Sequence, residues 1–150
     1  MSERDTDDTI EANVEEGYDS NPADQGRWLS ALVVLAGAWL VVQPFLVDLV
    51  ALHFWNNVLV GLALIVLGGF NYYRRAADRL ASTAAAGLVA LLGLWMIAVP
   101  FVLDATINFV VVPGPFGFWN DIIVGLIVLG LGLYSVYEAR DVDQPTALGQ

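Results

Sequence analysis

Residues 28–47 read WLSALVVLAGAWLVVQPFLV, twenty positions without an Asp, Glu, Lys or Arg. At about 1.5 Å per residue, a helix of this length reaches about 30 Å, the thickness of the hydrocarbon core of a bilayer. The stretch is apolar on all sides, whereas a helix on the surface of a soluble protein has one polar face. We therefore predict that it spans a membrane.

Three further stretches, 54–73, 80–103 and 118–137, have the same character. Together with 28–47 they predict an all-α, polytopic membrane protein with four transmembrane helices. This explains why a chain of 150 residues can be 57% hydrophobic and still carry a formal net charge of -10. The charge and the apolar residues lie in different parts of the chain.

Most of the negative charge lies in residues 1–26, where nine of the 16 acidic residues are opposed only by Arg4. We predict a disordered acidic cytoplasmic tail here, and a second, short cytoplasmic tail over 141–150. The acidic tail would bind a basic partner, or solvate the protein at high salt. The chain has no Lys, and this acidic composition resembles that of proteins from halophilic archaea. It offers no basic face for nucleic acid.

The arginines beyond the tail all fall on one side of the predicted spans. They are Arg27, Arg74, Arg75, Arg79 and Arg140. The connections on the other side contain no Lys or Arg. By the positive-inside rule, we predict a multi-pass protein of the cell (plasma) membrane with both termini in the cytoplasm.

The four spans consist of two copies of one helical hairpin. An offset of 56 gives eight identities over positions 32–48, and an offset of 64 gives eight over 54–68. We expect hairpins over 27–78 and 79–140, arranged as parallel repeats in a pseudo-two-fold bundle. The repeated residues that we interpret as structural are Gly37, Trp39, Pro44, Phe45, Trp55, Asn56 and Gly61, followed by Gly93, Trp95, Pro100, Phe101, Trp119, Asn120 and Gly125.

These repeated units resemble the SPW-repeat integral membrane proteins of bacteria and archaea, in which each repeat has two transmembrane helices. The present chain has Gln43-Pro44-Phe45 and Val99-Pro100-Phe101 where that family has Ser-Pro-Trp. The family has no established activity. The resemblance therefore implies an architecture and not a chemistry.

The prolines and the deep tryptophans should shape the hairpins. Pro44 and Pro100 fall near the ends of their spans, where proline ends or bends a helix. We expect them to close the hairpin, the alternative being a functional hinge. Trp39 and Trp95 lie too deep for an interfacial aromatic belt. We expect them to pack in the interior of the hairpin or bundle, where a carbonyl freed by proline is one candidate acceptor for the indole N–H. The alternative is a ligand-stacking role.

Asparagine and glycine positions suggest helix ends and packing faces. Asn56 and Asn120 open the second and fourth spans, and we expect them to act as N-caps. Gly61 and Gly68 are seven apart and share a helix face, as do their equivalents in the second hairpin. Such faces let membrane helices pack closely within a bundle, in a homo-oligomer or against another membrane protein.

Asp48 and Asp104 are the one repeated ionisable pair, each following a Pro-Phe element at the outer side. We expect both to be interfacial turn residues in water. The alternative is an outer-face cation site that the pseudo-two-fold axis assembles, with His53 and Asp121 nearby.

The composition excludes several kinds of chemistry. The chain has no Cys, no Lys and one His, so thiolate catalysis, Cys-type zinc sites, Schiff bases and two-His sites are excluded. We expect no cofactor, no metal and no enzyme activity. The favoured function is a non-catalytic structural or accessory membrane module, surrounded by lipid. The alternative is a small-solute or ion conductor or transporter acting as an oligomer.

Overall fold

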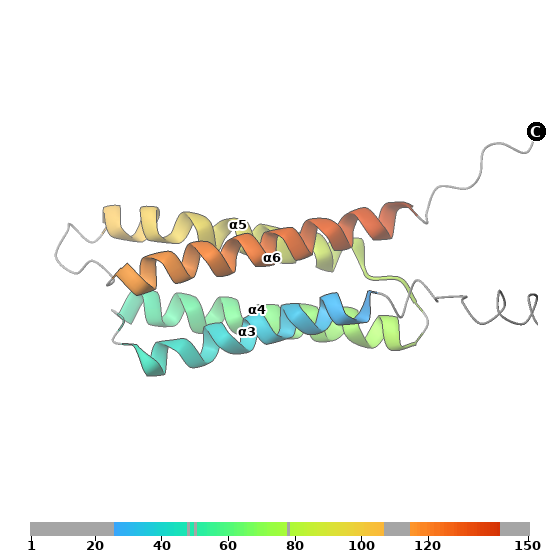
Figure 1. Ribbon diagram of the computed structural model, residues 1–150, viewed down its shortest axis with the longest axis horizontal. Helices are drawn as coiled ribbons and strands as arrows, with labels where there is room; N and C mark the ends of the chain where they lie inside the picture. The colour runs from blue at the N-terminus through green and yellow to red at the C-terminus, as the bar shows by residue number, and fades with distance from the viewer. Residues whose placement is uncertain (1–25, 48, 50, 78, 107–114, 142–150) are drawn as a thin grey trace, which may run out of the picture.

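The computed structural model describes residues 26–47, 49, 51–77, 79–106 and 115–141. Within these ranges the chain forms four α-helices and no strand: α3 (Arg27–Leu46), α4 (Ala51–Ala76), α5 (Thr83–Thr106) and α6 (Pro115–Asp141). Successive helices run in opposite directions (Figure 1). Each helix is long and apolar enough to cross a membrane. The predicted all-helical fold with four spans is confirmed.

The helices pair as two hairpins. Helix α3 packs mainly on α4, and α5 packs mainly on α6. In Figure 1 the two pairs lie as two layers, with α3 and α4 in one and α5 and α6 in the other. The layers meet through α4 with α5, and through a smaller contact between α3 and α6. Each predicted repeat is therefore one layer.

The two ends of the bundle differ in composition. At one end, α3 and α5 finish near Pro44 and Pro100, and α4 and α6 begin. We call this the proline end. The opposite end, which we call the arginine end, has the basic residues of the described chain: Arg27, Arg74, Arg75, Arg79 and Arg140.

The middle of the bundle is a packed apolar core. Leu40 and Met96 occupy equivalent positions in the two repeats, as do Leu64 and Val128, and all four are 0% exposed. Side chains on the outer faces, such as Leu35, are also apolar but exposed. An outward apolar surface is favourable in lipid, since lipid tails need no polar partner.

Glycines bring the two helices of each hairpin into contact. A Cβ atom added to Gly61 would lie 2.6 Å from the carbonyl oxygen of Gly37, and the reverse distance is the same. Gly93 and Gly125 form the equivalent contact in the second hairpin, at 2.8 Å in both directions. The glycine faces therefore pack inside each hairpin, where they are not available to a second copy.

The second helix of each hairpin begins earlier than the apolar stretch that predicts it. The apolar stretches predict starts at residues 54 and 118, but α4 begins at Ala51 and α6 at Pro115. Proline suits the first helical position, because its missing N–H would have no partner there. Asn56 and Asn120 consequently lie in the second turn of their helices. The expectation that they cap these helices is wrong.

The prolines of the two repeats lie near the ends of α3 and α5. Pro44 is two residues from the end of α3, where the Val47 amide donates to the Gln43 carbonyl at 3.1 Å. Helix α5 continues past Pro100 to Thr106. Both prolines are buried. The first therefore stands in the last turn of its helix, and the second is followed by six more helical residues.

Candidate functional site

Polar side chains are buried together at the proline end. Gln43 of α3, His53 and Asn57 of α4, and Asp121 of α6 are each 3% exposed or less. Buried polar groups in a membrane bundle need partners, since hydrocarbon supplies none. We call these four residues, with Asn56 and Asn120, the polar cluster.

One chain of hydrogen bonds enters the polar cluster from Trp95. The indole Nε1 of Trp95 on α5 donates to Asn56 Oδ1 on α4 at 2.9 Å. Asn56 Nδ2 then donates to Asn57 Oδ1 at 3.1 Å, and Asn57 Nδ2 donates to Asp121 Oδ1 at 3.3 Å. Each N–H points onward to the next acceptor, and the chain ends on a carboxylate in the other repeat.

A second, pseudo-symmetric chain starts at Trp39. Its Nε1 donates to Asn120 Oδ1 at 2.9 Å. Asn120 Nδ2 donates to Gln43 Oε1 at 2.7 Å and to Asp121 Oδ1 at 3.5 Å. Both chains therefore converge on the Asp121 carboxylate, which only accepts hydrogen bonds when ionised.

The tryptophans link the two repeats. Trp39 belongs to the first hairpin and bonds α6 of the second, while Trp95 belongs to the second and bonds α4 of the first. Both indoles are 41% exposed, so they lie at the surface of the bundle and not in its interior. The expectation that they pack in the interior is therefore wrong, and the indole acceptors are asparagine side chains and not the candidate carbonyls freed by proline.

The indole of Trp39 also fixes the orientation of Gln43. Only the oxygen of the Asn120 amide can accept from the indole, so its Nδ2 faces Gln43. The Gln43 oxygen must then face Asn120, which directs Nε2 elsewhere. Gln43 is 0% exposed, and this Nε2 has no hydrogen-bond partner among the described residues. Among the described residues, the polar cluster therefore holds a donor that makes no hydrogen bond.

His53 and Asp121 bring two ionisable groups together across the repeats. His53 Nδ1 lies 4.0 Å from Asp121 Oδ2, and the side chains are 1% and 4% exposed. The position equivalent to Asp121 in the first repeat is Asn57, and the position equivalent to His53 in the second is Gly117. The pair thus occurs once, although the fold around it is repeated.

An aromatic cluster flanks the polar cluster in each hairpin. Phe45 packs edge-on against Phe54, with ring centroids 5.2 Å apart, and Phe54 packs against Trp55 at 5.6 Å. In the second hairpin Phe101 packs against Phe118, which packs against Trp119. Trp55 and Trp119 are both exposed, which is typical of aromatic residues at a membrane interface.

The arginine end is held by a second set of polar contacts. Arg75 of α4 forms a two-pronged ion pair with Glu138 of α6, with nitrogen–oxygen distances of 2.8 and 3.1 Å. Asn71 Oδ1 accepts a hydrogen bond from the Ser82 amide at 2.9 Å, just before α5 begins. Polar contacts therefore join the two repeats at both ends of the bundle.

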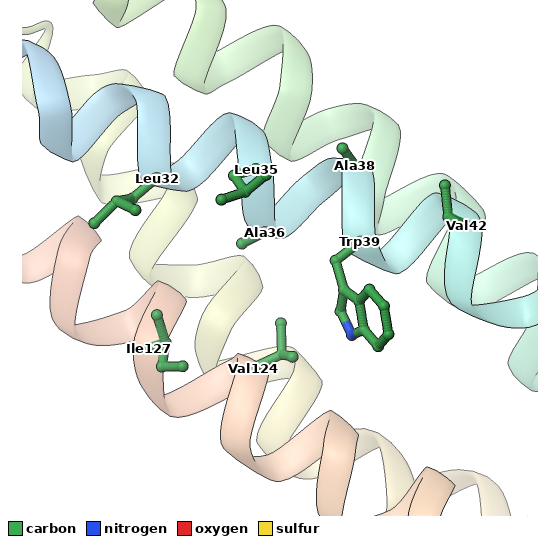
Figure 2. A pocket seen from close by; sticks show the side chains of 8 residues that line it. All are labelled: Leu32, Leu35, Ala36, Ala38, Trp39, Val42, Val124 and Ile127. Carbon is green, nitrogen blue, oxygen red and sulfur yellow. The ribbon is translucent and has the colours of Figure 1, made fainter.

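An apolar groove lies between α3 and α6, with a volume of about 580 Å³. Figure 2 shows Trp39 reaching from α3 toward α6 at one end of the groove, where Val124 faces it. Apart from the Trp39 indole, the lining is wholly aliphatic: Leu32, Leu35, Ala36, Ala38, Val42, Val124 and Ile127. The groove is suited to a hydrocarbon chain, and nothing in its lining selects one.

The structure brings only part of the predicted site together. Asp48, nearly all of the acidic tail over 1–26, and nearly all of the tail over 141–150 lie outside the described residues, as does the side chain of Asp104. The outer-face cation site is therefore not described. The sequence interpretation placed His53 and Asp121 nearby, but it did not identify the polar cluster.

A signal for the polar cluster was present in the sequence. Steps of three or four residues from Gly61 and Gly68 follow one helix face, and they lead to Asn57 and His53 in one direction and to Arg75 in the other. These residues are all buried on α4. Extending the glycine face along the helix would have found both polar ends.

Residues 27–135 match the family model described as the SPW repeat domain. No curated protein and no solved structure matches the chain. The matched region begins at the first residue of α3 and extends into α6, so it includes both hairpins and the polar cluster.

Proposed function

The chain belongs to the SPW repeat domain family, and we propose that it serves as a non-catalytic structural or accessory module of the membrane. One observation carries the proposal: the polar side chains inside the bundle bond one another across the repeats, and an apolar core separates the two polar ends. These contacts stabilise one arrangement of the two hairpins, as a structural role requires. Enzyme activity, cofactors and metals have no part in the proposal, since the chain has no Cys, no Lys and a single His.

The apolar core also bears on conduction. Asp121 at the proline end and Arg75 at the arginine end are separated by Leu40, Leu64 and Val128, none of which is exposed. Moving an ion through such a region would require it to lose its hydration without polar replacement. The bundle as described therefore favours a structural role over a path through a single copy.

The purified full-length protein, reconstituted in liposomes, is expected to give no proton or Na⁺ flux above that of protein-free vesicles. Flux would be followed with an internal pH dye and with a Na⁺-sensitive dye. The double variant Asp48→Asn/Asp104→Asn would be measured alongside. Flux from the unmodified protein that this variant reduces would contradict the structural role and support conduction.

The second candidate function is a small-solute or ion conductor that acts as an oligomer. The observation that favours it is the buried His53–Asp121 pair, because ionisable side chains inside membrane bundles often serve transport. A conducting path would then have to form between copies, outside the apolar core. The glycine faces are used within each hairpin, so contacts between copies would involve other surfaces.

We assign the acidic tail to partner binding at the cytoplasmic side, or to solvation at the high salt that the Lys-free composition suggests. Its charge supports both assignments, because residues 1–26 contain nine acidic residues and one arginine. Recovery of a basic protein from native membranes by the full chain, and not by a chain without 1–26, would distinguish partner binding.

The arginine end is assigned to the cytoplasm of the cell membrane, together with both termini. The support is that the described arginines all lie at that end. The chain has no Cys, so single cysteines introduced as Ser20→Cys and Thr106→Cys should react with an impermeant thiol reagent from opposite sides of the membrane. Reaction of both from outside intact cells would contradict this orientation.

A further inference from the structure

A second pocket lies between α3 and α6, at the arginine end of the bundle. It has a volume of about 480 Å³ and is lined by Trp28 and Leu29 of α3 and by Tyr134 and Glu138 of α6. Trp28 and Leu29 stand in the first turn of α3, and Glu138 stands in the last turn of α6. The pocket therefore lies where these two apolar helices end, and we call it the interfacial pocket.

The interfacial pocket and the apolar groove follow one another along the same two helices. On α3, Trp28 precedes the groove residue Leu32 by about one turn, and on α6, Tyr134 follows the groove residue Ile127 by about two turns. Figure 2 shows Leu32 and Val42 at the two ends of the groove. The groove therefore extends about 15 Å along α3, which is about half the thickness of the hydrocarbon core of a bilayer. A polar pocket followed by an apolar groove of this length has the same order and dimensions as a phospholipid in one leaflet.

Two alanines help to keep the groove open. Ala36 and Ala38 line it, and the equivalent positions of the second repeat, at the offset of 56, are Leu92 and Leu94. Leucine side chains on α3 would occupy space that the alanines leave free. The groove is therefore a feature of the first repeat's own sequence, and it does not follow from the duplicated hairpin.

Glu138 gives the interfacial pocket a negative lining. Its ion-pair partner Arg75 does not line the pocket, and the two side chains differ in exposure, at 1% for Arg75 and 21% for Glu138. The pocket thus presents the carboxylate while the guanidinium stays buried. Trp28 and Tyr134 are both more than half exposed, and aromatic faces attract cations. A carboxylate beside two aromatic side chains is suited to an ammonium group.

The other arginines at this end do not line the interfacial pocket either. The guanidinium of Arg27 lies over the ring of Tyr72 on α4, 5.4 Å from its centroid. Arg140 follows Glu138 by two residues, so the two side chains point to different faces of α6. An anionic head group would therefore meet a carboxylate in this pocket, and an ammonium group fits its charge better.

We propose that the interfacial pocket and the apolar groove together bind one phospholipid whose head group ends in an ammonium. The ammonium lies against Glu138, Trp28 and Tyr134, and one acyl chain lies in the groove. The surrounding lipid solvates an acyl chain about as well as the groove does, so the head group determines which lipid binds. This site goes beyond the proposed structural function and does not depend on it.

Head-group selectivity of the unmodified protein is the first test. The full-length protein in detergent would be titrated with dioleoyl phosphatidylethanolamine, phosphatidylcholine or phosphatidylglycerol, and the bound lipid would be counted by native mass spectrometry. We expect one lipid to bind saturably, with both ammonium lipids binding about fivefold more tightly than phosphatidylglycerol. Equal binding of the three lipids, or tighter binding of phosphatidylglycerol, would overturn the proposal.

Two pairs of variants separate the head-group pocket from the groove. Tyr134→Ala should reduce the preference for ammonium lipids by about threefold, whereas Tyr137→Ala, which removes an exposed tyrosine from the same helix, should leave it unchanged. Ala36→Leu should weaken the binding of all three lipids by about threefold through loss of chain contacts. Ala84→Leu, which adds the same side chain at an exposed position of α5, should not.

The same spectra show whether a second copy of the chain occupies the groove instead. A dimer that Ala36→Leu dissociates, with lipid binding unchanged, would overturn the proposal. So would a Tyr134→Ala variant that keeps the full head-group preference. If Ala36→Leu does not fold, the comparison of the three lipids on the unmodified protein still decides the matter.

Discussion

Glu138→Gln is expected to lower the free energy of unfolding by about 3 kcal/mol, because it leaves the Arg75 guanidinium buried without its counter-charge. Arg75 is 2% exposed, and it donates through both terminal nitrogens to Glu138 at 3.1 and 2.8 Å. The glutamine could accept only one of these bonds, and it carries no charge. The Glu138 side chain is 21% exposed, which places the effect near the lower limit for a broken buried pair.

The loss would be measured by unfolding in a detergent–SDS titration, followed by tryptophan fluorescence. Arg140→Gln is the matched control, since Arg140 is exposed on the last turn of the same helix and should change stability by no more than about 0.5 kcal/mol. The double variant Arg75→Leu/Glu138→Leu should recover most of the loss, because it buries no charge. Equal losses for Glu138→Gln and Arg140→Gln would show that the ion pair contributes nothing particular.

The spans and the repeat were predictable because they depend on features local to the chain. A run such as 28–47 is identified by its length and its lack of charge, whatever its neighbours do. The matching of Gly37 with Gly93 and of Gly61 with Gly125 identified the hairpin as the repeated unit. The structure uses these same glycines for the close contact within each hairpin. Glycines allow close packing because they have no side chain, and their positions can be read directly from the sequence.

The inter-repeat contacts were less predictable, because they depend on how the two hairpins are rotated against each other. Alignment pairs Arg75 with Ala139 and Arg74 with Glu138, so the repeat gives no indication that Arg75 and Glu138 meet. Likewise, Asn56 has the residue type of a helix cap, and only the earlier start of α4 at Ala51 shows that its side chain serves Trp95 instead. The position at which α4 begins therefore determines whether Asn56 caps the helix or binds Trp95.

A second large effect is expected at the glycine contact, where Gly61→Val should destabilise the first hairpin by about 3 kcal/mol. A Cβ on Gly61 would lie 2.6 Å from the Gly37 carbonyl oxygen and 2.9 Å from a methyl carbon of Val41. The first of these atoms belongs to the backbone, so it can move only if α3 and α4 separate. Unfolding in the same detergent–SDS titration would measure the loss.

The matched control for this prediction lies on the same helix. A Cβ atom added to Gly69 would meet no other atom within 4 Å, so Gly69→Val adds the same side chain toward open space and should change stability by less than about 0.5 kcal/mol. Gly125→Val and Gly130→Val form the equivalent pair on α6. Because the two glycine contacts lie in separate hairpins, the losses from Gly61→Val and Gly125→Val should add. If Gly69→Val were as damaging as Gly61→Val, close approach of α3 and α4 could not be the cause.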